Sequence, residues 1–384
     1  MIPRLLAILG GAAVPFTFSP YDQAWLIFPL LACLIYLWQR YPEKAFSIGW
    51  LWGTGQFLVG TYWVFISAHT YSGAPIYFAV FIALLLAVYL GSYHALIGWL
   101  WIRFQARNRG VSCALLIGLW VLAEFVRQWV FSGFPWLSVG YSQIDTPLAG
   151  FAPILGVYGL SALVLVVSYC LYSIVVKRLW RPEMATLGSI LVLSLVLWGH
   201  EWTEPTGETL KVAVVQANIN QGEKWTQQGL NKAIDLHLNL SRGVPEADML
   251  VWPEVALPGT FDRYRSIYTR FDRWLKSNEV VLVAGTMRAT ESGQFSNAMM
   301  TIGYGHDIKS PQFYDKRHLV PFGEFFPVPQ FVKAYLQAVK LPYTDLYRGA
   351  DSQPTLSVKG SSISASICFE DGFANEMIET AAKS

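Results

Sequence analysis

Long runs of apolar residues dominate the first half of the chain. A helix that crosses a bilayer needs roughly 20 mainly apolar residues, and seven runs approach or exceed this length. We therefore predict about seven membrane-spanning helices, at about 3–19, 22–38, 46–68, 75–101, 111–131, 156–176 and 185–201. The first run begins with Arg4 and an apolar stretch, which also suits a cleavable signal peptide. It has no obvious small-residue cleavage site, however, and six further runs follow it.

Beyond residue 203 the pattern changes to short apolar segments that alternate with amphipathic ones. Segments of this kind predict strands, which we place at 210–219, 247–257, 279–288 and 295–304, with a strand pair over 354–370. Helices are expected at about 224–243 and 261–277. Such alternation indicates an α/β domain. The predicted fold class is therefore a membrane α-helical bundle plus α/β, in two domains, 1–203 and 204–384.

Charge divides the chain at the same place. Residues 1–203 contain 10 Lys and Arg and 6 Asp and Glu, whereas the rest contains 18 and 20. Basic residues fall in alternate loops between the predicted spans: Arg40, Lys44, Arg103, Arg107, Arg109, Lys177, Arg178 and Arg181. The positive-inside rule puts these loops in the cytoplasm, so an odd number of spans delivers residue 203 to the outer side. A net charge of +2 without a basic patch indicates no nucleic-acid partner.

Three residues of the second domain can perform chemistry together. Glu254 and Cys368 fall where predicted strands end, the place where α/β domains hold reacting groups. A carboxylate can take the proton of a thiol, and the ammonium of Lys316 can stabilise the oxyanion that follows, with help from the backbone N–H of Phe369. Taken singly, each residue also suits a structural role: Glu254 as a solvated strand end, and Lys316 as a surface charge.

The four cysteines differ in context. Cys33, Cys113 and Cys170 lie inside predicted spans, where we expect them to act as small apolar residues. Cys368 has no partner in its own domain. A lone thiol there is either buried and inert or kept for its reactivity, and these residues alone leave both interpretations open. The six His residues lack the spacing of metal ligands, so we expect no metal and no cofactor.

Two charges lie inside the fifth predicted span. Glu124 and Arg127 are three residues apart, which allows them to pair on one helix face. Charges within a span are costly and are often functional. We therefore keep two interpretations, a structural pair and a role near lipid head groups.

Several stretches resemble the nitrilase (carbon–nitrogen hydrolase) superfamily and, with the apolar first half, the apolipoprotein N-acyltransferase family of bacterial lipoprotein maturation. The residues that carry the resemblance are WPE (252–254), KRHLVPFGE (316–324), ICFE (367–370) and VAVVQANINQGEKW (212–225). The second of these runs is long and specific, and the match extends over nearly the whole chain. The resemblance implies a nitrilase-like αββα sandwich for the second domain.

The resemblance also implies a reaction. Acyl transfer from a phospholipid to the N-terminal amine of a diacylglyceryl-cysteine apolipoprotein would pass through a thioester on Cys368, with Glu254 as base and Lys316 as oxyanion stabiliser. Glu324 would be a supporting carboxylate, and Trp225 would line the path to the site. The enzyme would be a multi-pass monomer of the bacterial inner membrane, with its catalytic domain on the periplasmic side.

Two other functions remain open. One is a membrane-tethered amidase or nitrilase that hydrolyses a small amide with the same three residues, and the other is an inactive membrane scaffold or transporter. The Pro-, Phe- and Tyr-rich stretch 305–350 is too long for a plain connection, and we expect a binding loop or lid there. If it covers a lipid substrate, replacing Phe322, Phe325 and Phe326 by Ser should weaken phospholipid use.

The sequence departs from the family pattern at two places. Family members often have Tyr after the nucleophile, where this chain has Phe369; a role of the backbone N–H tolerates that change. In addition, only 16 residues follow Cys368, whereas the family's domain continues with further strands and a last spanning helix. We therefore expect the α/β domain to be truncated at its C-terminus, and this chain alone to be poorly active or inactive.

Overall fold

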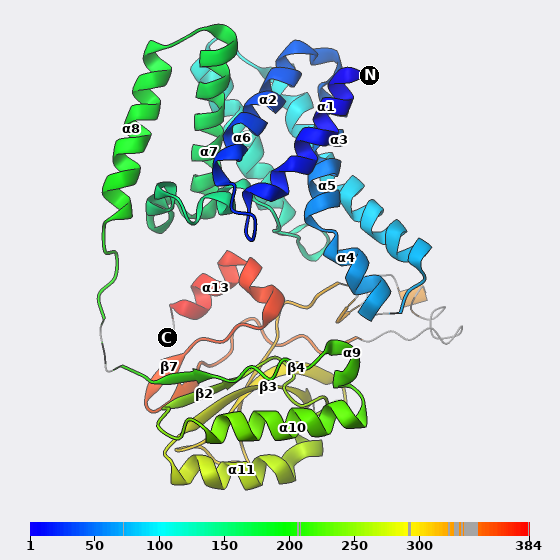
Figure 1. The fold of residues 1–384 in the computed structure, drawn as a ribbon, viewed down its shortest axis with the longest axis vertical. Coiled ribbons are helices and arrows are strands. Elements are labelled where there is room, and N and C mark those ends of the chain that lie inside the picture. Colours follow the sequence, from blue (N-terminus) through cyan, green and yellow to red (C-terminus); the bar gives the residue numbers. More distant parts are fainter. Residues whose placement is uncertain are drawn as a thin grey trace. The chain divides into compact units, whose positions relative to one another are not determined.

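A computed structural model describes residues 1–71, 73–205, 207, 209–290, 293–321, 323–325, 330, 331, 333, 345–382 and 384 (Figure 1). The chain forms two compact units, Met1–Pro205 and Thr206–Ser384. The first unit is helical and the second combines strands with helices. This division lies two residues beyond the predicted boundary at 203, and the predicted fold class, a helical bundle plus an α/β domain, is confirmed.

The first unit is built from helices that coincide with the predicted apolar runs. They are α1 (Ile2–Ala13), α2 (Ile27–Arg40), α3 (Ala45–Gly60), the short α4 (Trp63–Ile66), α5 (Ile76–Phe104), α6 (Arg109–Arg127), α7 (Ala152–Lys177) and α8 (Arg181–Trp198). Among the described residues, four segments are long and apolar enough to cross a membrane, at 76–104, 109–127, 147–177 and 181–198. Two further segments, Ala24–Arg40 and Pro42–Gly60, are bent by 108° and together make a fifth candidate. The number of seven spans stays a prediction.

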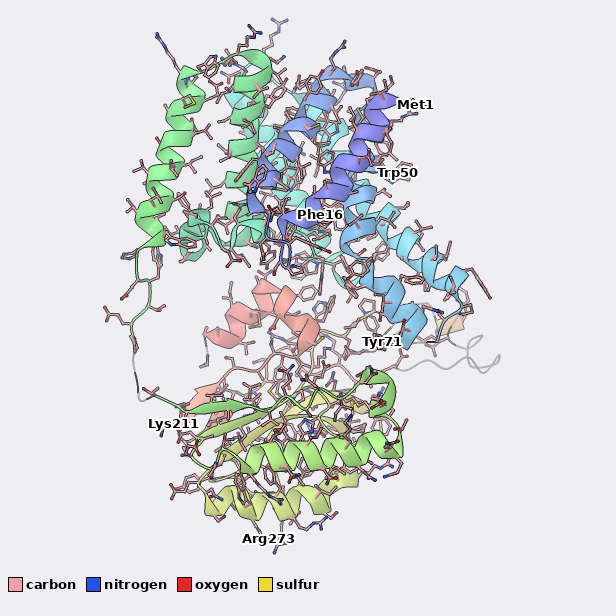
Figure 2. The ribbon with its side chains drawn as sticks, viewed as in Figure 1. Met1, Phe16, Trp50, Tyr71, Lys211 and Arg273 are labelled. Carbon is pink, nitrogen blue, oxygen red and sulfur yellow. The ribbon has the colours of Figure 1, made fainter. Side chains whose placement is uncertain are left out.

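Small residues allow α3 and α5 to approach closely. A Cβ atom added to Gly49 would lie 2.2 Å from the carbonyl oxygen of His94, and one added to Gly53 would lie 2.8 Å from the Cα of Gly91. Lipid tails are as apolar as the helix surfaces, so helices in a membrane gain stability from such close packing. The side chains on the outside of this unit are largely apolar, as Phe16, Trp50 and Tyr71 illustrate in Figure 2.

Glu124 and Arg127, the two charges of α6, are both buried. Glu124 accepts hydrogen bonds from three groups: the Trp120 indole (3.1 Å), the Val139 backbone N–H (2.9 Å) and the Ser161 hydroxyl (2.7 Å). Arg127 donates to the Ser138 hydroxyl at 3.0 Å. Within the described residues no ion pair joins Glu124 to Arg127 directly, and the two interpretations, a structural pair and a role near lipid head groups, stay predictions. The two charges tie α6 to the 138–139 turn, and Glu124 also ties it to α7.

The second unit contains a five-stranded mixed sheet. Its order is β1 (Val212–Val214), β2 (Met249–Trp252), β3 (Val281–Ala289), β4 (Phe295–Gly303) and β5 (Gln312–Asp315). Strands β1, β2 and β3 run parallel, whereas β4 is antiparallel to both β3 and β5. Strand β5 was not predicted and lies within the stretch 305–350, so the interpretation of that whole stretch as a loop or lid is wrong at 312–315. Phe322 and Phe326 lie outside the described residues, and a lid formed by the remainder stays a prediction.

Both faces of the sheet are covered. Helices α10 (Gln227–Arg242) and α11 (Arg265–Ser277) lie against one face (Figure 1), where their apolar side chains pack with Leu282 and Ala284 of β3. The hairpin of β6 (Leu356–Val358) and β7 (Ser361–Ile363) packs on the other face, against Val281 and Val283. Alternate residues of β3 therefore contribute to two separate cores. A strand buried on both faces reads as a continuous apolar run, as residues 280–284 do.

Candidate active site

Glu254 lies in the turn that follows β2. Pro253 ends the ladder after Trp252, and Val255 adopts a left-handed backbone conformation with φ 46°. The turn packs directly on β3, where a Cβ atom added to Gly285 would lie 2.6 Å from both the Cα of Glu254 and the carbonyl oxygen of Pro253. Gly285 is therefore required for the position of Glu254. The Glu254 side chain remains 39% exposed.

Lys316 directly follows β5 and its side chain is only 1% exposed. Its backbone N–H donates to the carbonyl oxygen of Asn297 on β4 at 2.8 Å, which extends the β4–β5 ladder by one residue. Its carbonyl oxygen accepts from the N–H of Gly349 at 2.9 Å. These two bonds hold the backbone of Lys316 on both sides, so the position of the ammonium depends on segments distant in sequence.

The Lys316 ammonium is close to two carboxylates. Its Nζ lies 2.9 Å from Glu324 and 3.7 Å from Oε1 of Glu254. Between the carboxylates, the Nδ2 of Asn297 donates to Glu254 Oε1 at 2.5 Å and to Glu324 Oε1 at 2.9 Å. The structure thus brings together three of the predicted site residues, and adds Asn297, which we did not predict. A single Asn within a strand carries no local signal that could have identified it.

Cys368 lies where an extended segment meets a short 3₁₀ helix, Cys368–Gly372. Its φ of 55° is left-handed, whereas Ile367 before it is extended. A non-glycine residue in this conformation is strained, and such strain clusters at functional sites. The residue is exposed, which contradicts the interpretation of a buried, inert thiol.

The charges of the other candidates act on Cys368. Partial desolvation and the Glu254 carboxylate raise the pKa of the thiol above its ordinary value, and Glu324 adds to this effect. The Lys316 ammonium and a hydrogen bond from the backbone N–H of Phe369 oppose it. Cys368 is therefore largely protonated at neutral pH, and a nearby base is needed to generate the thiolate.

Glu370, two residues beyond Cys368, is a buried carboxylate at 1% exposure. It accepts hydrogen bonds from four donors: the backbone N–H of Ile367 (2.7 Å), that of Arg317 (2.7 Å), that of His318 (3.2 Å) and the Tyr314 hydroxyl (3.1 Å). The carboxylate therefore joins the segment that carries Lys316 to the turn that carries Cys368. The sequence motif ICFE contains Glu370, but sequence spacing cannot identify its partners.

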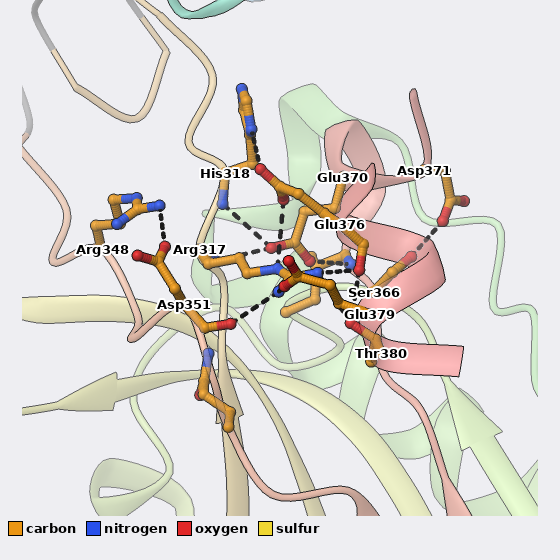
Figure 3. Close-up of polar contacts among 12 residues, drawn as sticks. Arg317, His318, Arg348, Asp351, Ser366, Glu370, Asp371, Glu376, Glu379 and Thr380 are labelled. Atoms are coloured by element: carbon orange, nitrogen blue, oxygen red, sulfur yellow. Dashed lines mark hydrogen bonds and ion pairs between the residues drawn. The ribbon is translucent and has the colours of Figure 1, made fainter. Parts of the chain in front are cut away.

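A second polar cluster joins Arg317 and His318, the residues that follow Lys316, to residues near the C-terminal end of the chain (Figure 3). The buried Arg317 donates to the carbonyl oxygen of Asp351 at 2.8 Å and to the Thr380 hydroxyl at 2.8 Å. The carboxylate of Glu376, on helix α13 (Ala374–Ala381), lies 2.8 Å from Nδ1 of His318 and 3.3 Å from Nε of Arg317. These contacts hold the segment of Arg317 and His318 against α13.

Trp225 lies near the same site. It follows the short helix α9 (Gln221–Lys224), and its side chain is exposed. The neighbouring Lys224 donates through Nζ to the backbone carbonyl oxygen of Glu254 at 3.1 Å. Burial lowers the pKa of Lys224, although Glu254 partly opposes this shift. Trp225 thus follows directly after Lys224, the residue that contacts the turn of Glu254. A role of Trp225 in substrate access stays a prediction. Among the described residues, no group of three or more His, Cys, Asp or Glu side chains could hold a metal ion.

Comparison with known proteins gives matches to both units of the chain. The family model for the apolipoprotein N-acyltransferase N-terminal domain matches residues 10–170, and the model for carbon-nitrogen hydrolase matches residues 211–384. The apolipoprotein N-acyltransferase of Methylococcus capsulatus is 35% identical over 98% of this chain and 75% of its own length. That of Chromobacterium violaceum is 36% identical over 100% and 74%, and that of Vibrio cholerae is 34% identical over 97% and 75%.

Proposed function

Because the chain belongs to the apolipoprotein N-acyltransferase family, with a nitrilase-like domain after its membrane helices, we propose that it N-acylates lipoproteins. The donor is a phospholipid, and the acceptor is the α-amine of a diacylglyceryl-cysteine at the N-terminus of an apolipoprotein. The acyl chain passes between them as a thioester on Cys368. The observation that carries this proposal is that the buried Lys316 ammonium lies 3.7 Å from Glu254 and 2.9 Å from Glu324. The Cys368 thiol, whose pKa these charges influence, is exposed and has a left-handed backbone conformation.

In the first half-reaction, the Cys368 sulfur attacks the ester carbonyl of the phospholipid. The thiol proton passes to Glu254, because the raised pKa of Cys368 leaves little thiolate before the substrate binds. The tetrahedral oxyanion receives hydrogen bonds from the Lys316 ammonium and the Phe369 N–H. The ester C–O bond then breaks, and Glu254 returns its proton to the departing lysophospholipid alkoxide.

In the second half-reaction, the acceptor amine attacks the thioester carbonyl. Glu254 accepts a proton from the amine, and the same two donors stabilise the second oxyanion. The C–S bond breaks, an amide forms, and Cys368 regains its proton. Glu324 supports both steps, because it holds the Lys316 ammonium at 2.9 Å.

A lipid-linked reaction suits a membrane protein of the bacterial inner membrane. Keeping acyl chains in the bilayer avoids a cost of roughly 0.8 kcal/mol for each CH₂ that would enter water. Basic residues follow α2 and α5 and flank the α7–α8 connection, and we assign these loops to the cytoplasm by the positive-inside rule. Figure 1 draws the N-terminus and the α7–α8 connection at one end of the helical unit. The catalytic unit then follows α8 on the periplasmic side, in a protein that acts as a monomer.

The direct test is mass spectrometry of the Cys368 peptide after incubation with vesicles of one defined phospholipid. We expect Cys368 to carry a thioester-linked acyl group with the mass of the donor's acyl chain. Hydroxylamine should remove this group, and a diacylglyceryl-cysteine peptide should accept it. The Cys170→Ser variant is the matched control, because Cys170 lies in α7. Absence of the fatty-acyl adduct, with ammonia release from a small amide, would instead support the hydrolase alternative.

A further inference from the structure

Asn297 lies between the two carboxylates of the site. It is 3% exposed on β4, and its Nδ2 is within hydrogen-bond distance of both Glu254 and Glu324. Each of the two amide hydrogens has one carboxylate acceptor. This orientation of the amide is the favourable one, since the opposite orientation would direct a carbonyl oxygen at two anions.

The Lys316 ammonium lies close to both carboxylates, but at unequal distances. Lys316 Nζ is 2.9 Å from Glu324 but 3.7 Å from Glu254. A neutral amide supplies a hydrogen bond to Glu254 without adding a charge. Glu254 thereby has a partner other than Lys316. If Asn297 were absent, Coulomb attraction would draw Glu254 and the Lys316 ammonium together.

Asn297 also acts through its backbone. Its carbonyl oxygen accepts the N–H of Lys316, and its register opposite Met287 on β3 is part of the nine-pair β3–β4 ladder. One residue therefore holds the backbone of Lys316 and the carboxylates of Glu254 and Glu324. Its Oδ1 is buried and has no hydrogen-bond partner within the described residues. A buried acceptor without a donor is costly. The amide nevertheless keeps this orientation, because both carboxylates accept hydrogen bonds from its Nδ2.

We propose that Asn297 is a positioning residue that keeps Glu254 apart from Lys316. Glu254 then remains available to take the Cys368 proton, while Lys316, held by Glu324, remains available for the oxyanion. This inference rests on the proposed function, because it assigns these two roles to separate groups.

The test compares Asn297→Ala and Asn297→Asp with the parent protein in single-turnover formation of the Cys368 acyl adduct across pH. Asp has nearly the same shape as Asn but replaces the donor by an acceptor. We expect both variants to lose about tenfold or more in rate near pH 7. Asn231→Ala is the control: Asn231 is an exposed residue of α10, and this variant should behave as the parent.

Iodoacetamide alkylation of Cys368 provides a measurement that does not require acyl transfer. In Asn297→Ala, Lys316 is drawn toward Glu254 and stabilises the thiolate less, so the pH midpoint of alkylation should rise. If the parent forms no acyl adduct but this midpoint still rises, the proposed function fails and the positioning role stands. An unchanged midpoint would overturn the positioning role. Because Asp matches Asn in size, a folded Asn297→Asp variant with the parent rate would overturn it too, even if Asn297→Ala did not fold.

Discussion

Replacing Glu370 by Gln tests how the site is assembled, because this substitution changes charge and hydrogen bonding with little change in shape. The parent carboxylate accepts the Ile367 N–H through Oε2 and the Arg317 N–H through Oε1, each at 2.7 Å. The amide of Gln has only one oxygen. Whichever way it turns, its NH₂ group faces a backbone donor that is already buried.

The cost follows from those contacts. Hydrogen bonds to a charged acceptor contribute about 1.5–3 kcal/mol, and a buried donor without a partner costs about 1–3 kcal/mol. The loss of one such bond and the weakening of the others should lower the free energy of unfolding by about 3 kcal/mol. For a unit of this size, that corresponds to a fall in Tm of roughly 6–12 °C.

Thermal unfolding in detergent, followed by tryptophan fluorescence, measures this change. Glu379→Gln is the matched control, since its side chain is 70% exposed and its carboxylate lies 3.9 Å from Arg317. Surface changes of this kind usually stay within about 0.5 kcal/mol. A Tm fall of less than about 2 °C for Glu370→Gln, or an equal fall for both variants, would refute the reasoning.

Two further predictions concern the site. Gly285→Val should displace the turn of Glu254 and reduce the acylation rate by about tenfold or more, because the Val side chain would occupy the position of that backbone. Gly188→Val is the control and should retain the parent rate, because a Cβ added at Gly188 meets nothing within 4 Å. Equal rates in both variants would contradict the packing argument. The pH midpoint of Cys368 alkylation should fall in Glu254→Gln and rise in Lys316→Met, because the first variant removes a charge that raises the thiol pKa and the second removes one that lowers it. Iodoacetamide kinetics across pH measure both shifts, and movement of the two midpoints in the same direction would contradict the proposed electrostatics.

Much of the architecture could be predicted from local patterns. Apolar runs correspond to the helices of the first unit because a lipid-facing helix must be apolar along its whole length. The strand run 279–288 corresponds to β3 because a strand buried on both faces is continuously apolar. Strand β5 escaped prediction because it is four residues long and lies in a polar, Pro-containing stretch. Tertiary pairing with β4 overrides such weak local preference.

The sequence by itself indicated the chemical groups of the candidate site: a carboxylate, an ammonium and a thiol within motifs that resemble the family. It could not determine which residues hold them. Lys316 and Glu254 are 62 positions apart yet lie at 3.7 Å, and Asn297 and Glu370 join segments that only the sheet brings together. The reason is physical. The reactive groups recur in recognisable local motifs, whereas the charges and hydrogen bonds that position them depend on distances across strands, which arise only when the chain folds.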